Sequence, residues 1–229
     1  MPHRCRMVRS ISRRCEPVPD RPTLSVEIEG LNRGDTSVLG SIHLQVAPGE
    51  VVALVGPSGI GKTSLLRAVA GLGGRVQGRI DAPSRIAYVF QEPTLLPWRN
   101  VLANVVLPTG CSEAEAREFL AQVGLAGRGG DWPDALSLGQ QRRLSLARAF
   151  AAQPDLLLLD EPFVSLDAEL VEEMMTLLED RLGASSTAAL LVTHARPEAE
   201  RLAHRIITLS GRPATVAAEQ VLQPARAIG

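Results

Sequence analysis

Residues 56–63 read GPSGIGKT and fit the pattern G-x-x-x-x-G-K-[ST]. Glycines at this spacing let the backbone turn so closely that successive N–H groups point into one concavity, which binds anions. Lysine adds a compact positive charge, and the hydroxyl of the last residue can bind a divalent cation. The stretch predicts a loop that binds the phosphates of a nucleotide together with Mg²⁺. The residues expected to contact the nucleotide here are Gly56, Pro57, Ser58, Gly59, Ile60, Gly61, Lys62, Thr63 and Ser64.

Of the 24 basic residues, Lys62 is the only lysine, and all the others are arginine. The planar guanidinium of arginine is a poor substitute for a compact ammonium group deep inside a phosphate-binding loop. The exception indicates that chemistry requires lysine at this position. It also argues against a GTPase, because the guanine-reading motif N-K-x-D needs a second lysine.

A second acidic element, LLLLDEP, spans residues 156–162. Its apolar run is typical of a parallel strand buried on both faces, which would deliver Asp160 to the edge of the sheet beside the phosphate loop. There Asp160 would hold Mg²⁺, directly or through water, and Glu161 would orient or deprotonate an attacking water. The alternative is a pair of solvated carboxylates at the end of a strand.

Strand-like and helical runs alternate around these motifs. Residues 23–31 and 41–46 alternate apolar and polar side chains, as half-buried strands do, and residues 50–56 are almost continuously apolar up to the phosphate loop. A helix is predicted after that loop, and further strands are predicted at residues 85–90, 156–160, 187–194 and 205–210. This alternation predicts an α/β fold with a mostly parallel sheet and N-terminal antiparallel strands, and together with the phosphate loop it resembles the P-loop NTPase (RecA-like) class.

From Gln91 as far as Pro154 the pattern is helical and contains no convincing strand. Ser112 and Glu115 form an S-x-x-E capping box that opens one helix, and residues 139–153 form another. This middle block is best explained as a helical subdomain inserted into the nucleotide-binding core.

The chain is therefore expected to have three kinds of region. Residues 1–22 are predicted to be a disordered arginine-rich leader, residues 23–90 and 155–229 the nucleotide-binding core, and residues 91–154 the inserted helical subdomain. A weak attraction to anionic lipid is an alternative role for the leader.

The composition is that of an ordinary globular protein, with 229 residues, a formal net charge of −1 and 45% hydrophobic residues. The near-neutral charge gives no reason to expect nucleic-acid binding through a broad basic surface. The cysteines, Cys5, Cys15 and Cys111, lack metal-binding spacing and fit a reducing cytoplasm. No apolar run approaches the roughly 18 to 20 residues needed to cross a bilayer, so we do not expect the chain to span a membrane.

Four further motifs follow the phosphate loop along the chain. They are Gln91 in YVFQEP, LSLGQQRR at residues 136–143, SLD at residues 165–167, and His194 in LVTH. Together with the phosphate loop and the acidic element, they resemble the nucleotide-binding subunits of ATP-binding cassette (ABC) transporters, from Thr23 to about Ser210. Taken singly, Gln91 could be a surface loop residue and His194 a strand-end histidine. Their order and spacing favour the family.

The resemblance implies ATP as the nucleotide, Mg²⁺ as its metal, and hydrolysis coupled to transport. It implies that Gln91 contacts Mg²⁺ or the attacking water, that His194 contacts the γ-phosphate, and that Glu161 and Lys62 complete the catalytic set. It also implies a head-to-tail dimer of two copies of the chain, in which the signature stretch 136–143 of one copy closes over ATP held by the other. The additional nucleotide contacts would then be Ser137, Gly139, Gln140 and Asp167.

Two positions depart from the family pattern. Leu138 stands where the family usually has a second glycine, and leucine adds bulk and restricts the backbone beside the phosphate. Either this half of the site is weakened, or Leu138 points away and the helix start still binds. Arg33 stands where the family tends to stack an aromatic residue on adenine. We expect its guanidinium to stack on the base, with Val38 packing beside it.

Residues 89–105, VFQEPTLLPWRNVLANV, look like the same region of importers of the nitrate, sulfonate and taurine group. The resemblance implies that residues 91–105 contact transmembrane permease subunits at the cytoplasmic face of the inner membrane, where the chain would be peripheral. A solute-binding protein would take part indirectly. Trp98 and the apolar residues 95–97 could form a groove for the permease; alternatively, Trp98 packs inside the helical subdomain.

Two other functions stay open at this point. A P-loop small-molecule kinase would need a second-substrate pocket and would leave the signature, SLD and VTH motifs without a task. A non-transport ABC-type ATPase acting on nucleic acid or ribosomes usually has fused tandem cassettes or long coiled-coil insertions, which do not fit in 229 residues. Too few residues follow Ser210 for the regulatory C-terminal domain of some importer subunits, so none is expected.

Overall fold

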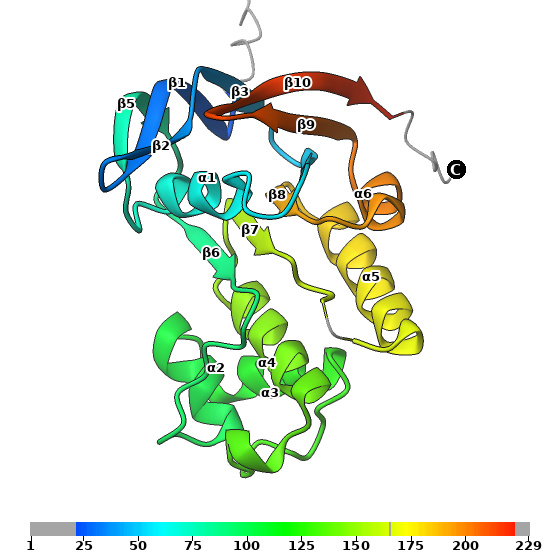
Figure 1. The fold of residues 1–229 in the computed structure, drawn as a ribbon. Helices are drawn as coiled ribbons and strands as arrows, with labels where there is room; N and C mark the ends of the chain where they lie inside the picture. The colour runs from blue at the N-terminus through cyan, green and yellow to red at the C-terminus, as the bar shows by residue number, and fades with distance from the viewer. Residues whose placement is uncertain (1–21, 165, 223–229) are drawn as a thin grey trace, which may run out of the picture.

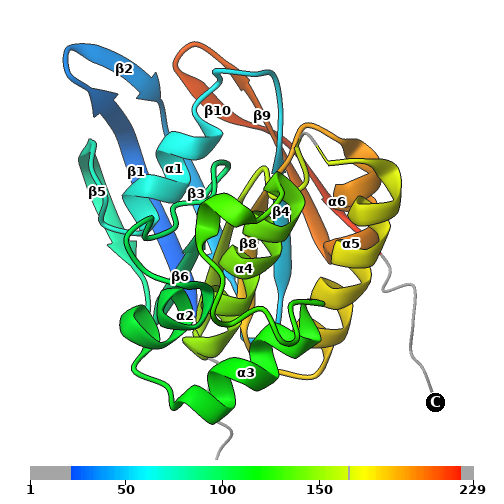
Figure 2. The same ribbon diagram turned by 90° about the horizontal axis from the view of Figure 1, so that it is seen from below.

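A computed structural model describes residues 22–164 and 166–222 (Figure 1). The expected arginine-rich leader lies outside the described residues, apart from its last position. The described chain forms a mixed sheet with helices on both faces and a group of helices at one end (Figures 1 and 2). The α/β fold expected from the sequence is therefore confirmed.

The parallel part of the sheet carries both predicted phosphate-site strands, with one further strand between them. Its strands, in spatial order, are β9 (Arg205–Gly211), β4 (Val51–Val55), β8 (Ala188–Val192), β7 (Leu156–Asp160) and β6 (Ile86–Val89). Alternate side chains of a strand point to opposite sides of the sheet, and on these strands both sets pack in the core. In β4, Val52 and Leu54 pack in one core cluster, whereas Val51 and Ala53 pack in the other.

Helices cover both faces of these parallel strands. Helix α1 (Lys62–Val69) contributes Leu65 and Leu66 to the cluster on one face. On the other face, α5 (Ala168–Gly183) and α6 (Arg196–Leu202) pack with part of α4 (Leu138–Ala151). The connection β4–loop–α1 thus has the strand-loop-helix arrangement that the phosphate-binding motif requires.

The antiparallel strands extend the sheet away from the helical end. Strand β1 (Leu24–Arg33) pairs with β2 (Thr36–Leu39), β3 (Ile42–Val46) and β5 (Arg75–Asp81), and β10 (Ala214–Val221) pairs with β9. The sequence did not predict β2, β5 or β10. Most of their side chains are exposed or only half-buried, so they lack the apolar alternation that marked β1 and β3.

Between β6 and β7 the described chain is helical. It forms α2 (Val101–Thr109), α3 (Glu113–Gln122), the short 3₁₀ helix η1 (Pro133–Ala135) and α4, grouped at the lower end of Figure 1. The predicted capping box at the start of α3 is present. These helices share an apolar cluster of their own, to which α4 contributes Leu144 and Ala147, while Leu146 and Ala149 of the same helix join the sheet cluster. Helix α4 therefore belongs to both packing units, and a domain boundary at 91–154 stays a prediction.

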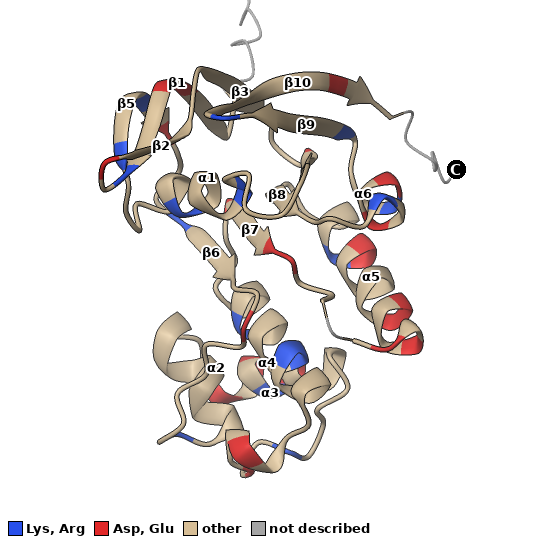
Figure 3. Cartoon of the chain, viewed as in Figure 1, with Lys and Arg blue, Asp and Glu red and all other residues tan. Residues whose placement is uncertain are grey.

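Two surface properties bear on partners. Basic and acidic residues occur together on some elements, such as α6 and β5, whereas α4 carries only arginines and α5 is mainly acidic (Figure 3). In the described part of the chain, no helix is both long enough and apolar enough to cross a membrane.

Candidate functional site

The loop between β4 and α1 has the backbone that the glycine pattern predicts. Gly56 and Gly61 have φ of 148° and 114°, which L side chains rarely adopt. A β-carbon would also collide at both places, 2.7 Å from the carbonyl oxygen of Leu209 at Gly56 and 2.8 Å from Val38 Cγ1 at Gly61. Gly61 is the N-cap of α1 and provides no side-chain cap, so the first N–H groups of the helix are left for a ligand.

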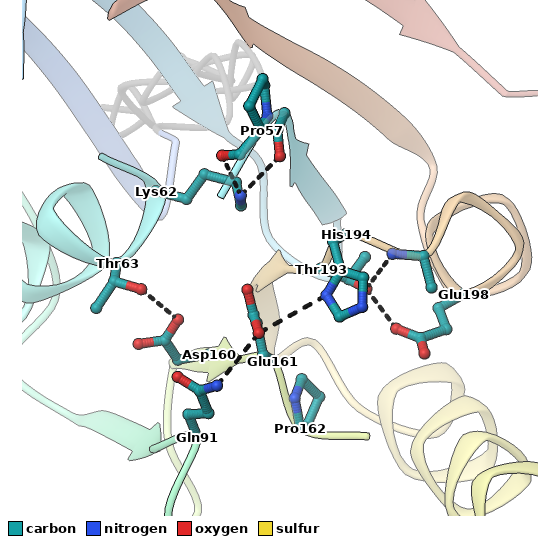
Figure 4. Close-up of polar contacts among 12 residues, drawn as sticks. Pro57, Lys62, Thr63, Gln91, Asp160, Glu161, Pro162, Thr193, His194 and Glu198 are labelled. Carbon is teal, nitrogen blue, oxygen red and sulfur yellow. Dashed lines mark hydrogen bonds and ion pairs between the residues drawn. The ribbon is translucent and has the colours of Figure 1, made fainter. Parts of the chain in front are cut away.

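Lys62 lies inside this loop, with 4% of its surface exposed. Its Nζ donates hydrogen bonds to the carbonyl oxygens of Gly56 at 2.8 Å and Pro57 at 3.0 Å (Figure 4). Burial lowers the pKa of Lys62, and the nearby carboxylates of Glu161 and Asp160 oppose that shift. A single ammonium group is thus held over the concavity by backbone oxygens.

Asp160, at the end of β7, is buried and holds two hydroxyl groups. Thr63 Oγ1 donates to Asp160 Oδ1 at 2.8 Å, and Tyr88 Oη donates to Asp160 Oδ2 at 2.9 Å. The alternative of a solvated carboxylate pair is wrong for Asp160, which is one of the buried polar residues. The predicted metal ligands Thr63 and Asp160 therefore do meet.

Tyr88 is a site residue that the sequence analysis missed. It lies on β6, which pairs in parallel with β7, so its ring can reach the end of the neighbouring strand. The ring stacks on Phe90 with centroids 4.0 Å apart, and burial together with the charge of Asp160 raises the pKa of the phenol. The available signal was the alternation of side chains along a strand. Tyr88 pairs with Leu158, and Leu158 and Asp160, two residues apart, share one face of the sheet.

The oxygen ligands at this point suit Mg²⁺. The described residues contain no group of three or more His, Cys, Asp or Glu side chains that could hold a metal alone. Mg²⁺, however, is usually bound by one or two protein oxygens together with substrate phosphates and water. Asp160 and Thr63, beside the phosphate loop, provide that donor set.

Glu161 occupies the centre of the candidate site, between Gln91 and His194 (Figure 4). Its Oε2 lies 3.4 Å from Gln91 Nε2, which donates to it, and 3.7 Å from His194 Nδ1. Its backbone has φ of 48°, an unusual value for a residue other than glycine, and its N–H donates to the carbonyl oxygen of Val192 at 2.9 Å. The structure thus brings three residues from three separate motifs together.

His194 lies in the turn between β8 and α6, which is held by hydrogen bonds of the neighbouring Thr193. Thr193 Oγ1 donates to Glu198 and accepts from the N–H of Ala195 at 3.0 Å. Burial raises the pKa of Glu198, a shift that the hydrogen bond from Thr193 and the nearby His194 oppose. The sequence analysis missed Thr193 and Glu198, whose contact joins the strand end to α6. The His194 side chain itself is exposed.

The signature residues gather at the start of α4. Ser137 is the N-cap and forms a capping box with Gln140, in which each backbone N–H donates to the other residue's side chain. Gly139 packs so closely on Leu170 of α5 that a β-carbon would collide with it. Leu138 is 45% exposed, which favours the alternative that its side chain points away. Among the described residues, no hydrogen bond joins this helix end to the phosphate loop of the same chain.

Three other predicted contacts have different local roles. Asp167 is the N-cap of α5 and accepts from the N–H of Leu170 at 2.9 Å. Val38 packs beside Gly61 of the phosphate loop. Arg33 is the exposed last residue of β1, and its stacking on a base stays a prediction.

The segment after Gln91 is shaped by a residue that the sequence analysis missed. Asn104 of α2 is fully buried; its Oδ1 accepts from the N–H of Leu96 at 2.7 Å, and its Nδ2 donates to the carbonyl oxygens of Leu96 and Arg99 at 3.1 and 2.9 Å. These bonds hold the loop so that Trp98 is 65% exposed. The alternative that Trp98 packs inside the helical region is therefore wrong.

Comparisons with known proteins indicate the family. The family model described as ABC transporter matches residues 39–164. The chain is 48% identical over 187 residues to an aliphatic sulfonates import ATP-binding protein of Rhodococcus jostii, covering 79% of this chain and 76% of the relative. A protein of the same description from Granulibacter bethesdensis is 46% identical over 206 residues, covering 88% and 84%.

Solved structures are similar over nearly the same extent. A dimeric structure of the ATP-binding cassette MJ0796 bound to ADP and Pi has a TM-score of 0.77 and 27% identity, covering 87% of this chain and 99% of that one. Another dimeric structure of the same cassette, described as a bacterial ABC transporter cassette, has a TM-score of 0.76 and 28% identity.

Proposed function

Because the chain belongs to the ABC transporter family, we propose that it is the ATP-hydrolysing subunit of an importer for a small solute. The observation that carries this proposal is the position of the Glu161 carboxylate, 3.4 Å from Gln91 and 3.7 Å from His194. It lies beside the hydrogen-bonded pair of Thr63 and buried Asp160 and a loop shaped for phosphate.

The geometry supports a separate task for each group in hydrolysis. The loop N–H groups and the Lys62 ammonium would hold the β- and γ-phosphates. Thr63 and Asp160, with Gln91, would hold Mg²⁺, which when bound neutralises charge on the phosphate oxygens. Glu161 would accept a proton from the attacking water, which Gln91 would help to orient, and His194 would donate to the γ-phosphate.

The start of α4 points to a second copy of the chain as partner. The Ser137 cap accepts only the N–H of Gln140, so the N–H groups of Leu138 and Gly139 at this helix N-terminus remain for a phosphate. No hydrogen bond among the described residues joins this end to the phosphate loop of its own chain. A head-to-tail dimer would place it over the ATP held by the other copy. The dimeric solved structures of the family support this arrangement.

The exposed loop around Trp98 supports a permease as the second partner. Asn104 fixes the loop within residues 91–105, so an apolar contact surface is presented without reorganisation. Such a partner would place the chain peripherally at the cytoplasmic face of the membrane. The relatives named for aliphatic sulfonate import favour an organic sulfonate or a similar small oxyanion as the solute, delivered by a solute-binding protein.

The proposal is tested by assaying the purified chain with MgATP alone and then together with membranes that hold the candidate permease. We expect phosphate release without any added acceptor, and co-purification with a polytopic membrane protein. A small-molecule kinase would release no phosphate until its second substrate is added. Capture of nucleic acid or ribosomes in place of a membrane protein would favour a non-transport ATPase.

Leu138→Gly tests whether the unusual signature residue weakens the site. Because Leu138 is 45% exposed at the first turn of α4, its side chain does not cover the capped end of the helix. We expect the ATPase rate of the variant to lie within about twofold of the parent, while glycine at an exposed helix position lowers stability by roughly 1 kcal/mol. A rate increase of tenfold or more would show that leucine obstructs the partner's nucleotide.

A further inference from the structure

Arg142 of α4 is a buried cation that the roles above leave unused. It is 7% exposed, and among the described residues it forms no ion pair. Its one hydrogen bond runs from Nη1 to the carbonyl oxygen of Pro162 at 3.2 Å, while its Nε has no partner in the described chain. Burial lowers the pKa of Arg142, yet an arginine side chain stays charged in proteins.

The accepting carbonyl belongs to the residue directly after Glu161. Glu161 has φ of 48°, a strained conformation that persists only where the surroundings hold it in place. On one side, its N–H is fixed by Val192 at 2.9 Å. On the other side, Arg142 donates to the carbonyl oxygen of Pro162. Because the proline ring fixes its own φ, this bond also restrains the backbone of Glu161, which directly precedes it.

The contrast with neighbouring arginines of the same helix is informative. Arg143 forms an ion pair with Glu173 of α5 at 3.2 Å, and Arg148 donates to Thr94 at 2.7 Å. Arg142 alone of these three has its hydrogen bond on the segment that carries Glu161. Since a buried charge without a carboxylate is unfavourable, packing alone does not account for an arginine at this position.

We propose that Arg142 is a positioning residue that holds the Glu161 carboxylate in its place for hydrolysis by hydrogen bonding to the Pro162 carbonyl. The proposal rests on the proposed function of Glu161. Arg142 also stands on the helix whose first residues include the signature, so the carboxylate is held from the element expected to contact the partner's nucleotide.

Arg142→Met removes the charge and the donor but keeps most of the apolar length. We expect kcat for ATP hydrolysis to fall about 10- to 100-fold, because a misplacement of roughly 1 Å in a reacting group can cost about 100-fold. KM for ATP should stay within about twofold, since the phosphate loop is untouched. The melting temperature should be unchanged or higher, because replacing an uncompensated buried charge by an apolar side chain is often neutral or stabilising.

Two further variants make the test specific. Arg142→Lys keeps one donor at nearly the same reach and should recover most of the lost kcat. Arg117→Met removes the same charge from exposed α3, where Arg117 pairs with Glu113, and should leave kcat near the parent value. A merely structural arginine would instead lower the melting temperature, with kcat falling only as far as folding is lost.

The outcomes separate this inference from the proposed function. If Glu161→Gln abolishes hydrolysis but Arg142→Met does not lower kcat, the positioning role is wrong and the role of Glu161 stands. If Glu161→Gln leaves hydrolysis intact, the proposed function of Glu161 is wrong, and the positioning role of Arg142, which rests on it, is wrong as well. Equal losses in Arg142→Met and Arg117→Met would overturn the inference, since they would reflect the loss of a positive charge rather than the Pro162 contact.

Discussion

Glu161→Gln is expected to lower kcat for ATP hydrolysis by about 1,000-fold, within the range that a positioned general base contributes. The amide keeps the size of the side chain but cannot accept a proton from water. ATP binding should persist, because Lys62 and the phosphate loop are unchanged. Without hydrolysis the ATP-bound dimer should become long-lived, and size-exclusion chromatography with light scattering should show a dimer with MgATP and a monomer with MgADP.

Glu200→Gln provides the matched control for this variant. Glu200 lies on α6, where it forms an exposed ion pair with Arg196, so the same chemical change occurs away from the site. Its hydrolysis rate should match that of the parent. Retention of more than about a tenth of the parental rate in Glu161→Gln would show that another group accepts the proton, because removal of a working base costs about 100-fold or more.

The parts of the site that the sequence predicted are those whose chemistry lies in one short string. The phosphate loop, its lysine and the strand that ends in Asp160 each combine a local backbone requirement with a local chemical one. The buried strands β4 and β7 were equally readable, since they are apolar on both faces. For these elements local pattern and global fold agree, which makes prediction from one sequence possible.

The missed residues act across long sequence separations. Tyr88 and Asp160 are 72 positions apart, and nothing in the string AYVF indicates that this tyrosine reaches a carboxylate on the next strand. Arg142 lies inside a recognised motif, but its contact with Pro162 depends on how α4 packs beside the end of β7. Asn104 looks like an ordinary polar helix residue until the loop it holds is known. Such contacts arise from tertiary packing, which composition and periodicity do not encode locally.

Lys62→Arg is expected to lower kcat/KM for ATP by about 100-fold, the scale for losing one preorganised donor to a transferring group. The Lys62 ammonium fits between the carbonyl oxygens of Gly56 and Pro57, at 2.8 and 3.0 Å, with 4% of the residue exposed. A guanidinium is larger and planar, so it cannot present one compact charge from that position. Because the substitution keeps the positive charge, a loss of kcat/KM reports on the shape of the cationic group rather than on its charge.

The arginine-rich composition allows an internal control and an independent readout. Arg79→Lys makes the reverse exchange on exposed β5, where the side chain is 75% exposed, and should leave hydrolysis unchanged. Since Lys62 is the only lysine, an amine-reactive reagent has a single side-chain target in the parent chain, and mass spectrometry should show that MgATP protects it. If MgATP protects Lys62 in the parent chain but Lys62→Arg hydrolyses ATP with normal kinetics, any cation suffices in the loop. Loss of both binding and hydrolysis would explain why, in a chain that otherwise uses arginine for every basic position, this one position keeps lysine.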